Sequence, residues 1–320
     1  MQLAELAERY AEFRALLFSI AYRLTGSAVE AEDALQDGYV RVHDAAGAHG
    51  EEWVESPRAY LSTLITRLCL DHLKRVKTDR ERYDGPWLPE PVLTAAGARE
   101  AADPAEESEL RESISLAFLV LLEALSPEER AAFLLHEVFE YPHDEIAPMI
   151  GKSPAACRQL LRRAHTRLEE RRKVHSGAAV SSRRRRSAST AADHQRLMTR
   201  FLHAVERGDV QALAATLAAD VVHVSDGGGK AFAARRPIVG REAVLNFLAG
   251  LLRLKPPGTR FTSEQVNGGP ALLVWVGEQL IQVTTLEVED GVVTRSHAVV
   301  NPDKLGYLRR QLEEGQPAQV

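Results

Sequence analysis

Three serine–proline pairs constrain the fold of the first half of this 320-residue chain, because each predicts where a helix begins. The serine hydroxyl can accept from the first free N–H groups of a helix, and proline already has the φ angle of the first helical turn. The pairs are Ser56-Pro57, Ser126-Pro127 and Ser153-Pro154, and each precedes apolar residues spaced three or four apart. We therefore predict that residues 1–83 and 113–173 are all-helical.

The first block is predicted to be a bundle of three or four helices. Apolar residues recur at helical spacing over 10–24, and Thr25-Gly26 ends that run. Ser27 can cap a helix over about 28–44, whose buried stripe is expected to contain Ala31, Leu35, Tyr39 and Val42. The long helix after Ser56-Pro57 completes the bundle.

The second block has the layout of a helix-turn-helix. Ser126-Pro127-Glu128-Glu129 is a capping box with proline at the first helical position. A short helix over about 143–150, the turn Gly151-Lys152 and a long helix to about 172 follow.

One face of the long helix carries side chains of the types that can read a major groove. Cys157, Leu160, Leu161, Ala164 and Leu168 share the apolar face, so both the thiol and its neighbours are expected in the core. Arg158, Gln159, Arg162, Arg163 and Thr166 face away from it. Arginine can bond guanine and glutamine can bond adenine, although a solvated basic face would give the same pattern.

The net charge of −5 hides two basic segments. Residues 57–83 carry seven basic against three acidic side chains, and 152–186 carry twelve against two. The first segment combines cations with Trp53, Tyr60 and Tyr83 nearby, which is typical of a surface that binds single-stranded nucleic acid. Cations drawn to a helix end by its dipole are the alternative.

An acidic face occupies the helix at 28–44. Glu32, Asp33, Gln36 and Asp37 lie opposite its apolar stripe, where they could contact a basic partner helix or simply face solvent.

The rest of the chain changes character twice. The run Asp84–Pro91 cannot be helical because of its closely spaced prolines, and it begins a linker. A Ser/Ala/Arg tether follows the second block. Helices at 192–206, 210–218 and 241–253 then precede strands at 259–266, 271–276, 279–288 and 292–300, with a hairpin at Glu289-Asp290-Gly291. This order predicts an α+β domain with an antiparallel sheet.

Several classes of protein are disfavoured. Cys69 and Cys157 are far apart and lack metal-ligand spacing, so neither a disulfide framework nor a metal site is expected, and no motif calls for a cofactor. The acidic, amphipathic N-terminus is not a signal peptide, and no apolar run reaches the ~18 residues of a membrane span. We expect a cytoplasmic protein with no membrane partner.

Together these features resemble the extracytoplasmic-function sigma factors of bacterial RNA polymerase. The resemblance covers residues 1–173, through AYRLTGSAVEAEDALQDGYVRV, SPRAYLSTLITRLCLDHLKR and the segment that begins LSPEERAAFLLHEVFEY. It is closer still to a SigJ-like subclass with a C-terminal SnoaL-like (NTF2-like) extension. Three signatures of that subclass are present: Trp87-Leu88-Pro89-Glu90-Pro91, Asp226-Gly227-Gly228-Gly229-Lys230 and Asn301-Pro302-Asp303-Lys304-Leu305.

The resemblance implies a multidomain organisation. It comprises sigma region 2 (1–85), a linker (86–112), region 4 (113–175), a basic tether (176–190), a cone-shaped α+β SnoaL-like domain (191–312) and a tail (313–320). Core RNA polymerase would contact Glu32, Asp33, Gln36 and Asp37. The −10 element would contact Arg58, Tyr60, Lys74, Arg75, Lys77 and Arg80. The −35 element would contact Lys152, Arg158, Gln159, Arg162, Arg163 and Thr166.

The resemblance also implies that the extension regulates the sigma factor in cis, through the three signatures and without a dedicated anti-sigma factor. Other readings of the extension remain. Some members of its fold family are enzymes, and His223, Asp226 and His297 are candidate acid–base residues, although a lone histidine on a strand is more often structural. We predict no catalytic residue. The domain could also bind a small ligand, and a helix-turn-helix regulator fused to a ligand-sensing or enzymatic domain is the alternative for the whole chain.

Overall fold

The computed structural model describes residues 1–94, 114–175 and 191–315. They divide into two compact units, each described here by itself. The helical unit contains Met1–Glu81 and Leu119–His175, and the C-terminal unit contains Arg82–Phe118 together with the chain from Ser176 to Ala318. The predicted tether, most of the predicted linker and the end of the tail lie outside the described residues. In the part that is described, no helix is long and apolar enough to cross a bilayer.

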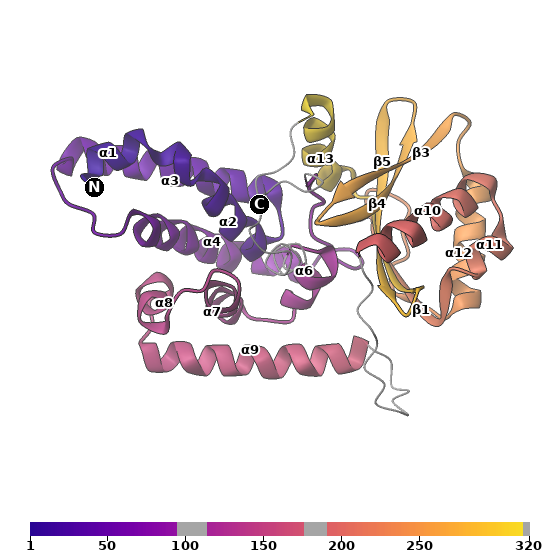
Figure 1. Ribbon diagram of the computed structural model, residues 1–320, viewed down its shortest axis with the longest axis horizontal. Helices are drawn as coiled ribbons and strands as arrows, with labels where there is room; N and C mark the ends of the chain where they lie inside the picture. Colours follow the sequence, from indigo (N-terminus) through magenta and orange to yellow (C-terminus); the bar gives the residue numbers. More distant parts are fainter. Residues whose placement is uncertain (95–113, 176–190, 316–320) are drawn as a thin grey trace. The chain divides into compact units, whose positions relative to one another are not determined.

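The helical unit begins with the predicted bundle (Figure 1). Its elements are α1 (Leu3–Glu8), the 3-10 helix η1 (Tyr10–Phe13), α2 (Arg14–Thr25), α3 (Ala28–His49) and α4 (Pro57–Glu81). The start of α3 is confirmed, because Ser27 Oγ accepts from the N–H of Glu30 at 3.1 Å. Ala31, Leu35 and Val42 are buried as predicted, but the prediction for Tyr39 was wrong. Tyr39 is 45% exposed and its ring makes an edge-to-face contact with that of Tyr10, since it lies at the margin of the apolar stripe.

The helix-turn-helix is confirmed in the same unit. It consists of α7 (Pro127–Glu137), α8 (His143–Ile150) and α9 (Pro154–His175), preceded by α6 (Leu116–Leu122) at the boundary between the units. Both hydrogen bonds of the Ser126–Glu129 capping box are present, and Gly151 ends α8 in the left-handed conformation. Helices α7 and α8 pack between α9 and α4 (Figure 1).

The C-terminal unit is an α+β domain with a single six-stranded sheet. Its helices are α10 (Ala191–Arg207), α11 (Val210–Ala214), α12 (Arg241–Leu254) and α13 (Pro302–Glu314). Its strands are β1 (Leu217–Asp226), β2 (Ile238–Val239), β3 (Thr259–Val266), β4 (Gly269–Val276), β5 (Gln279–Glu289) and β6 (Val292–Val299). The strand order is β2-β1-β6-β5-β4-β3.

Two predictions for this unit were wrong. The helix expected over 210–218 ends at Ala214, because the alternating run that follows, rich in valine, forms β1 instead. The sheet is also not purely antiparallel, since β1 pairs in parallel with β6.

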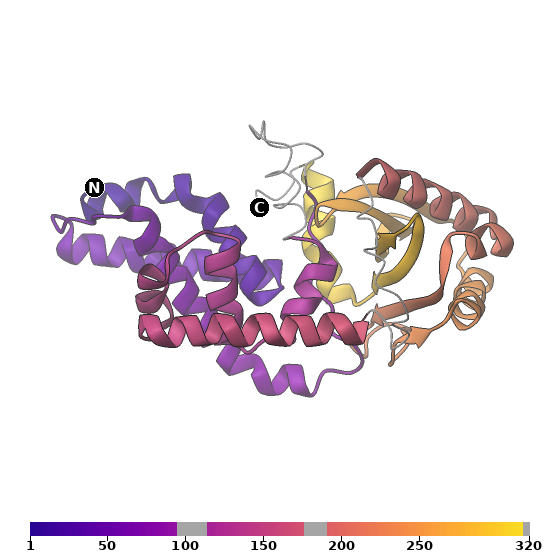
Figure 2. The same ribbon diagram turned by 60° about the horizontal axis from the view of Figure 1, so that its bottom comes forward.

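Helices cover both faces of the sheet. On one face, α10, α11 and α12 close over the apolar core, to which Phe201, Val244 and Leu286 contribute. Leu273 and Val283 are buried on the opposite face, where α13 packs against β5 (Figure 2). The end of β1 lies beside the first turn of α13, where Asp226 meets Lys304.

Candidate functional site

The predicted −35 residues form an exposed face on α9. Ser153 Oγ accepts from the N–H of Ala156 and fixes the start of the helix. Cys157, Ala164 and Leu168 are buried as expected, Leu160 and Leu161 are half-buried, and the polar residues between them point outward. Arg158, Gln159, Arg162, Arg163 and Thr166 are all exposed, and so is Lys152, which pairs with Glu128 at 3.1 Å.

The predicted −10 residues on α4 divide into two groups. Lys74, Arg75 and Lys77 are exposed. Arg80 is mostly buried: it donates to the carbonyl oxygen of Thr25 at 2.5 Å and pairs with Glu123 at 3.4 Å. Arg80 therefore has a structural role in the described conformation.

Arg58 is also engaged, by a tyrosine from the segment between α7 and α8. Its Nε donates to Tyr141 Oη at 3.2 Å, and its guanidinium lies 5.2 Å from the centre of that ring. Tyr141 Oη is also 2.9 Å from Ser62 Oγ. Sequence reasoning used Tyr141 only as the residue before a proline and missed this contact.

Three further arginine contacts join α2 and α4 to the helix-turn-helix. Arg67 donates to the carbonyl oxygen of Pro148 at 2.6 Å, and Arg130 donates to that of Leu24 at 2.8 Å. Buried Arg23 lies 5.7 Å from the ring centre of Phe139. We call this set, together with Arg58, Ser62 and Tyr141, the α4–α8 junction.

Beside Tyr60 the chain forms a cleft that contains an exposed tryptophan. Trp53 is 68% exposed and Tyr60 is 38% exposed. The cleft is completed by Leu3, Ala45, His49, Glu52, Val54, Glu55 and Ser56. The aromatic residues predicted near the first basic segment thus flank one hollow at the start of α4, although Tyr83 belongs to the C-terminal unit.

The acidic face of α3 is present as predicted. Asp33, Gln36 and Asp37 are exposed, whereas Glu32 is partly covered and pairs with Arg14 at 2.7 Å.

The three signature motifs meet within the C-terminal unit, around one buried carboxylate. Asp226, at the end of β1, is fully buried. Its Oδ2 accepts from the N–H of Leu88 at 2.8 Å and from Lys304 Nζ at 2.7 Å, while its Oδ1 accepts from Tyr83 Oη at 2.6 Å. One side chain therefore binds the linker and α13 together.

Lys304 completes the arrangement from the first turn of α13. Its Nζ also donates to the carbonyl oxygen of Leu88 at 2.5 Å, and it lies 4.0 Å from the ring centre of Trp87 and 4.8 Å from that of Tyr83. Asn301, which caps α13, donates to Tyr83 Oη at 2.8 Å. We call Tyr83, Trp87, Leu88, Asp226, Asn301 and Lys304 the linker latch.

Burial, and next its hydrogen bond to Asp226, raises the pKa of Tyr83 well above its ordinary value. The hydroxyl therefore stays protonated and remains a donor to the carboxylate. In a buried site, a carboxylate needs such partners to offset the loss of water.

The glycines of the second motif allow the latch to close. Gly228 has φ +55°, and a Cβ there would lie 2.3 Å from Asn301 Nδ2 and 2.7 Å from Tyr83 Oη. Only glycine fits both the backbone conformation and the approach. Lys230 lies outside the latch, because it forms an exposed ion pair with Asp303.

The remaining motif residues vary in exposure. Pro89, Glu90, Pro91, Gly227 and Leu305 are buried, whereas Gly229, Pro302 and Asp303 are exposed.

The candidate acid–base residues of this unit do not form one site. His223 aligns with Ser296 and Val224 with His297, so the two histidines point to opposite faces of the sheet. His223 Nδ1 is 2.8 Å from Ser296 Oγ, and burial lowers its pKa to about 4. His297 lies 3.6 Å from Glu287, whose pKa burial raises to about 7. Asp226 is used by the latch.

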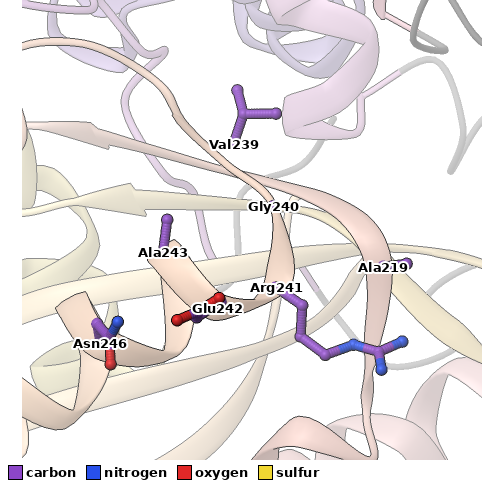
Figure 3. Close-up of a pocket in the computed structure, with 7 residues that line it drawn as sticks. All are labelled: Ala219, Val239, Gly240, Arg241, Glu242, Ala243 and Asn246. Atoms are coloured by element: carbon purple, nitrogen blue, oxygen red, sulfur yellow. The ribbon is translucent and has the colours of Figure 1, made fainter.

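An open depression lies at the start of α12 (Figure 3). Ala219, Val239, Gly240, Arg241, Glu242, Ala243 and Asn246 line it. It contains one cation and one anion and no convergent set of donors. Across the described residues, no group of three or more His, Cys, Asp or Glu side chains could hold a metal ion.

Comparisons with known proteins match the two helical regions and the α+β domain in the order in which they occur in the chain. Sigma-70 region 2 matches residues 9–78, Sigma-70, region 4 matches 115–168, and the SnoaL-like domain matches 198–300. The chain is 35% identical over 306 residues to the ECF RNA polymerase sigma factor SigJ of Mycobacterium tuberculosis, covering 92% of each chain. It is 32% identical over 308 residues to the probable ECF sigma factor SigI of that species, covering 94% of this chain and 95% of SigI.

A solved structure also matches this chain over nearly its whole length. The crystal structure of M. tuberculosis SigJ matches with a TM-score of 0.68 at 30% identity, covering 97% of this chain and 99% of that one. The predicted fold class, helical regions followed by an α+β SnoaL-like domain, is confirmed.

Proposed function

Since the chain belongs to the ECF RNA polymerase sigma factors, we propose that its C-terminal unit regulates promoter-specific initiation in cis through the linker latch. As a sigma factor it binds core RNA polymerase and promoter DNA. The latch is the observation that supports regulation, because it attaches the chain between regions 2 and 4 to the SnoaL-like unit. A tethered domain acts at high effective concentration, so no separate anti-sigma protein is needed.

On the DNA, the exposed face of α9 reads the −35 element in the major groove. Arg158, Arg162 and Arg163 bond guanine edges or phosphates, Gln159 bonds adenine, and Lys152 and Thr166 contact the backbone. Each side chain is exposed, and together they form one helical face.

The −10 element binds along α4 as a separated strand. Lys74, Arg75 and Lys77 hold phosphates, and an extruded base stacks in the cleft between Trp53 and Tyr60. Arg58 and Arg80 join them only when their contacts with Tyr141 and Glu123 are broken. In the described conformation part of the −10 surface is therefore covered.

Core RNA polymerase contacts the acidic face of α3 through Asp33, Gln36 and Asp37, with Glu32 at its edge. We retain the predicted domain boundaries, with 191–312 as the regulatory domain, and propose that it is not an enzyme. His223 and His297 on opposite faces of the sheet support that proposal.

Ligand sensing by the C-terminal unit is a second candidate function. His223 Nε2 is buried without a hydrogen-bond partner, and Phe247 lies 5.2 Å from its ring. An unpaired buried polar atom costs about 1–3 kcal/mol, which a ligand acceptor or donor would recover. Isothermal titration with candidate apolar ligands, on the native chain and on His223→Leu, tests this function.

The main test uses full-length protein. Asp226→Asn with Lys304→Met removes both latch charges and leaves no unpaired charge in the interior. Transcription by core polymerase reconstituted with this variant should differ at least severalfold from the native chain, at equal sigma concentration. The template is a promoter selected from a random library with the native holoenzyme.

The matched control is Arg309→Met with Glu313→Gln. It makes the same change of charge at an exposed ion pair on the same helix, whose atoms are 3.7 Å apart. Equal transcription by native chain, latch variant and control would contradict cis regulation. Removal of residues 191–320 provides an independent check.

A further inference from the structure

The hairpin turn between β3 and β4 holds both ends of the segment that joins regions 2 and 4. Its two loop residues are Asn267 and Gly268, with φ +52° and +74°. This is the geometry of a two-residue hairpin turn in which Asn-Gly is favoured. The turn itself therefore leaves the Asn267 side chain available for other contacts.

That side chain bonds two points of the linker that are far apart in sequence. Asn267 Oδ1 accepts from the N–H of Val92 at 3.2 Å, and Nδ2 donates to the carbonyl oxygen of Ile114 at 3.0 Å. The side chain is buried, as are Val92 and Ile114. All these residues belong to the C-terminal unit.

The contacts of the two ends differ among the described residues. The earlier end is also fixed by backbone bonds to the free edge of β3: Asn267 N–H to Val92 oxygen at 3.0 Å and Thr94 N–H to Gln265 oxygen at 2.9 Å. Gln311 of α13 accepts from the N–H of Leu93 at 2.8 Å. At the later end, within the part of the chain that the structure describes, the Asn267 side-chain amide donates to the carbonyl oxygen of Ile114, and Ile114 and Leu116 are buried.

We propose that Asn267 is a clip that limits how far region 4 can move from region 2. This rests on the proposed function and adds a specific regulatory residue that is separate from the latch. With the clip closed, Leu119 begins within roughly 18 Å of Ile114, at about 3.5 Å per extended residue. With the Ile114 end released, the 25 peptide units between Thr94 and Leu119 set an upper limit of roughly 90 Å on their separation.

The difference matters on a promoter. Elements at −10 and −35 are centred about 25 base pairs apart, or roughly 85 Å of duplex at ~3.4 Å per base pair. A closed clip keeps region 4 close to the docked linker, and an open clip gives it the length it needs to reach the −35 element. Release of the Ile114 end alone is therefore enough to let region 4 reach the −35 element.

Two substitutions of Asn267 test its bonds to the two ends separately. Asn267→Gly keeps the left-handed backbone and deletes the side-chain bonds to Val92 and Ile114. Asn267→Asp keeps an acceptor for Val92 but sets a carboxylate against the carbonyl oxygen of Ile114, and aspartate also tolerates this conformation. Asp290→Gly is the matched control, because Asp290-Gly291 is the turn of another two-residue hairpin in the same unit, with φ +51° at Asp290.

The first readout is hydrogen exchange at the Val92 amide in the full-length protein. Exchange should accelerate about tenfold in Asn267→Gly and stay close to native in Asn267→Asp and Asp290→Gly. The second is transcription by holoenzyme at limiting sigma concentration, on the selected promoter and on variants with longer spacers. Both Asn267 variants should raise it by similar factors of roughly two to ten, most on the longer spacers.

Several results would overturn the proposal. Native exchange in Asn267→Gly would show that the side chain does not hold Val92. Unchanged transcription in both Asn267 variants, or an equal rise in Asp290→Gly, would show that the clip does not limit reach. Failure of the latch variants to alter transcription removes cis regulation by the latch, but the exchange pattern at Val92 still decides whether the clip exists.

Discussion

Two contacts between segments that are distant in sequence are built from different chemistry. The α4–α8 junction joins regions 2 and 4 through arginines that donate to neutral acceptors, namely the Pro148 and Leu24 oxygens and the Tyr141 hydroxyl, although Arg130 also pairs with Glu123 at 2.7 Å. The linker latch is centred on a buried ion pair, Asp226 with Lys304. Phosphate oxygens are stronger acceptors for arginine than carbonyl oxygens are, because the bond is between full charges.

The difference indicates which contact gives way to DNA. A promoter offers Arg58 and Arg67, which are exposed, charged partners in place of neutral ones, so the free energy of binding DNA offsets the cost of opening these two contacts. It offers nothing comparable to Asp226, which is fully buried. We therefore expect DNA to open the junction directly and the latch to change only when the C-terminal unit itself is altered.

The largest expected effect is at the centre of the latch. Asp226→Ala leaves the Lys304 ammonium buried without its counter-ion, and breaking such a pair by removing one partner costs about 3–5 kcal/mol. Urea unfolding of the full-length protein should show this loss in the transition of the C-terminal unit. Restoration by Lys304→Met in the same chain would assign the cost to the unpaired charge, and no restoration would refute that assignment.

Acid should weaken the C-terminal unit through His223. Burial lowers the folded pKa to about 4, so the unfolded chain binds a proton below its ordinary value of 6.5 while the folded chain does not. The stability from this group is therefore complete above pH 6.5 and is lost as the pH falls toward 4, by about 2 kcal/mol at pH 5. The unfolding free energy of His223→Gln should depend less on pH over this range, whereas exposed His203→Gln should behave like the native chain.

A medium effect is expected at the junction. Tyr141→Phe deletes the hydroxyl that bonds Ser62 and Arg58, and so favours the open form by about 1 kcal/mol. The affinity of the free protein for a single-stranded −10 oligonucleotide should rise about fivefold, measured by fluorescence anisotropy. Tyr39→Phe, at an exposed position of α3, serves as the control. A lower affinity in Tyr141→Phe would mean that the hydroxyl contacts DNA rather than the junction.

The sequence was informative where structure is local. Ser27, Ser126 and Ser153 cap their helices as predicted, because a cap depends on residues three positions apart. The exposed face of α9 also follows from periodicity alone. Motif resemblance brought Asp226, Leu88 and Lys304 to attention, but not that one carboxylate bonds the other two.

Contacts across long sequence separations could not be predicted in this way. No residue near Tyr141 in the sequence indicates that its hydroxyl will bond Arg58 and Ser62. In the same way, no residue near Asn267 indicates that its side chain will bond Val92 and Ile114. A tyrosine or an asparagine has many possible partners, and the tertiary fold selects among them. The parallel pairing of β1 with β6 was missed for the same reason, since a hairpin signal reports only neighbouring strands.

The smallest effect is expected within a signature motif itself, at Lys230. The resemblance places Lys230 and Asp303 with the interdomain residues, yet they form an ion pair with side chains 56% and 60% exposed. Exposed pairs contribute about 0–1 kcal/mol, so Lys230→Met with Asp303→Asn should leave the unfolding free energy nearly unchanged. Transcription should also remain within about twofold of native, in contrast to the latch variant. A change as large as that of the latch variant would mean that this surface pair contacts something other than solvent, and that a buried ion pair is not what distinguishes the regulatory contact.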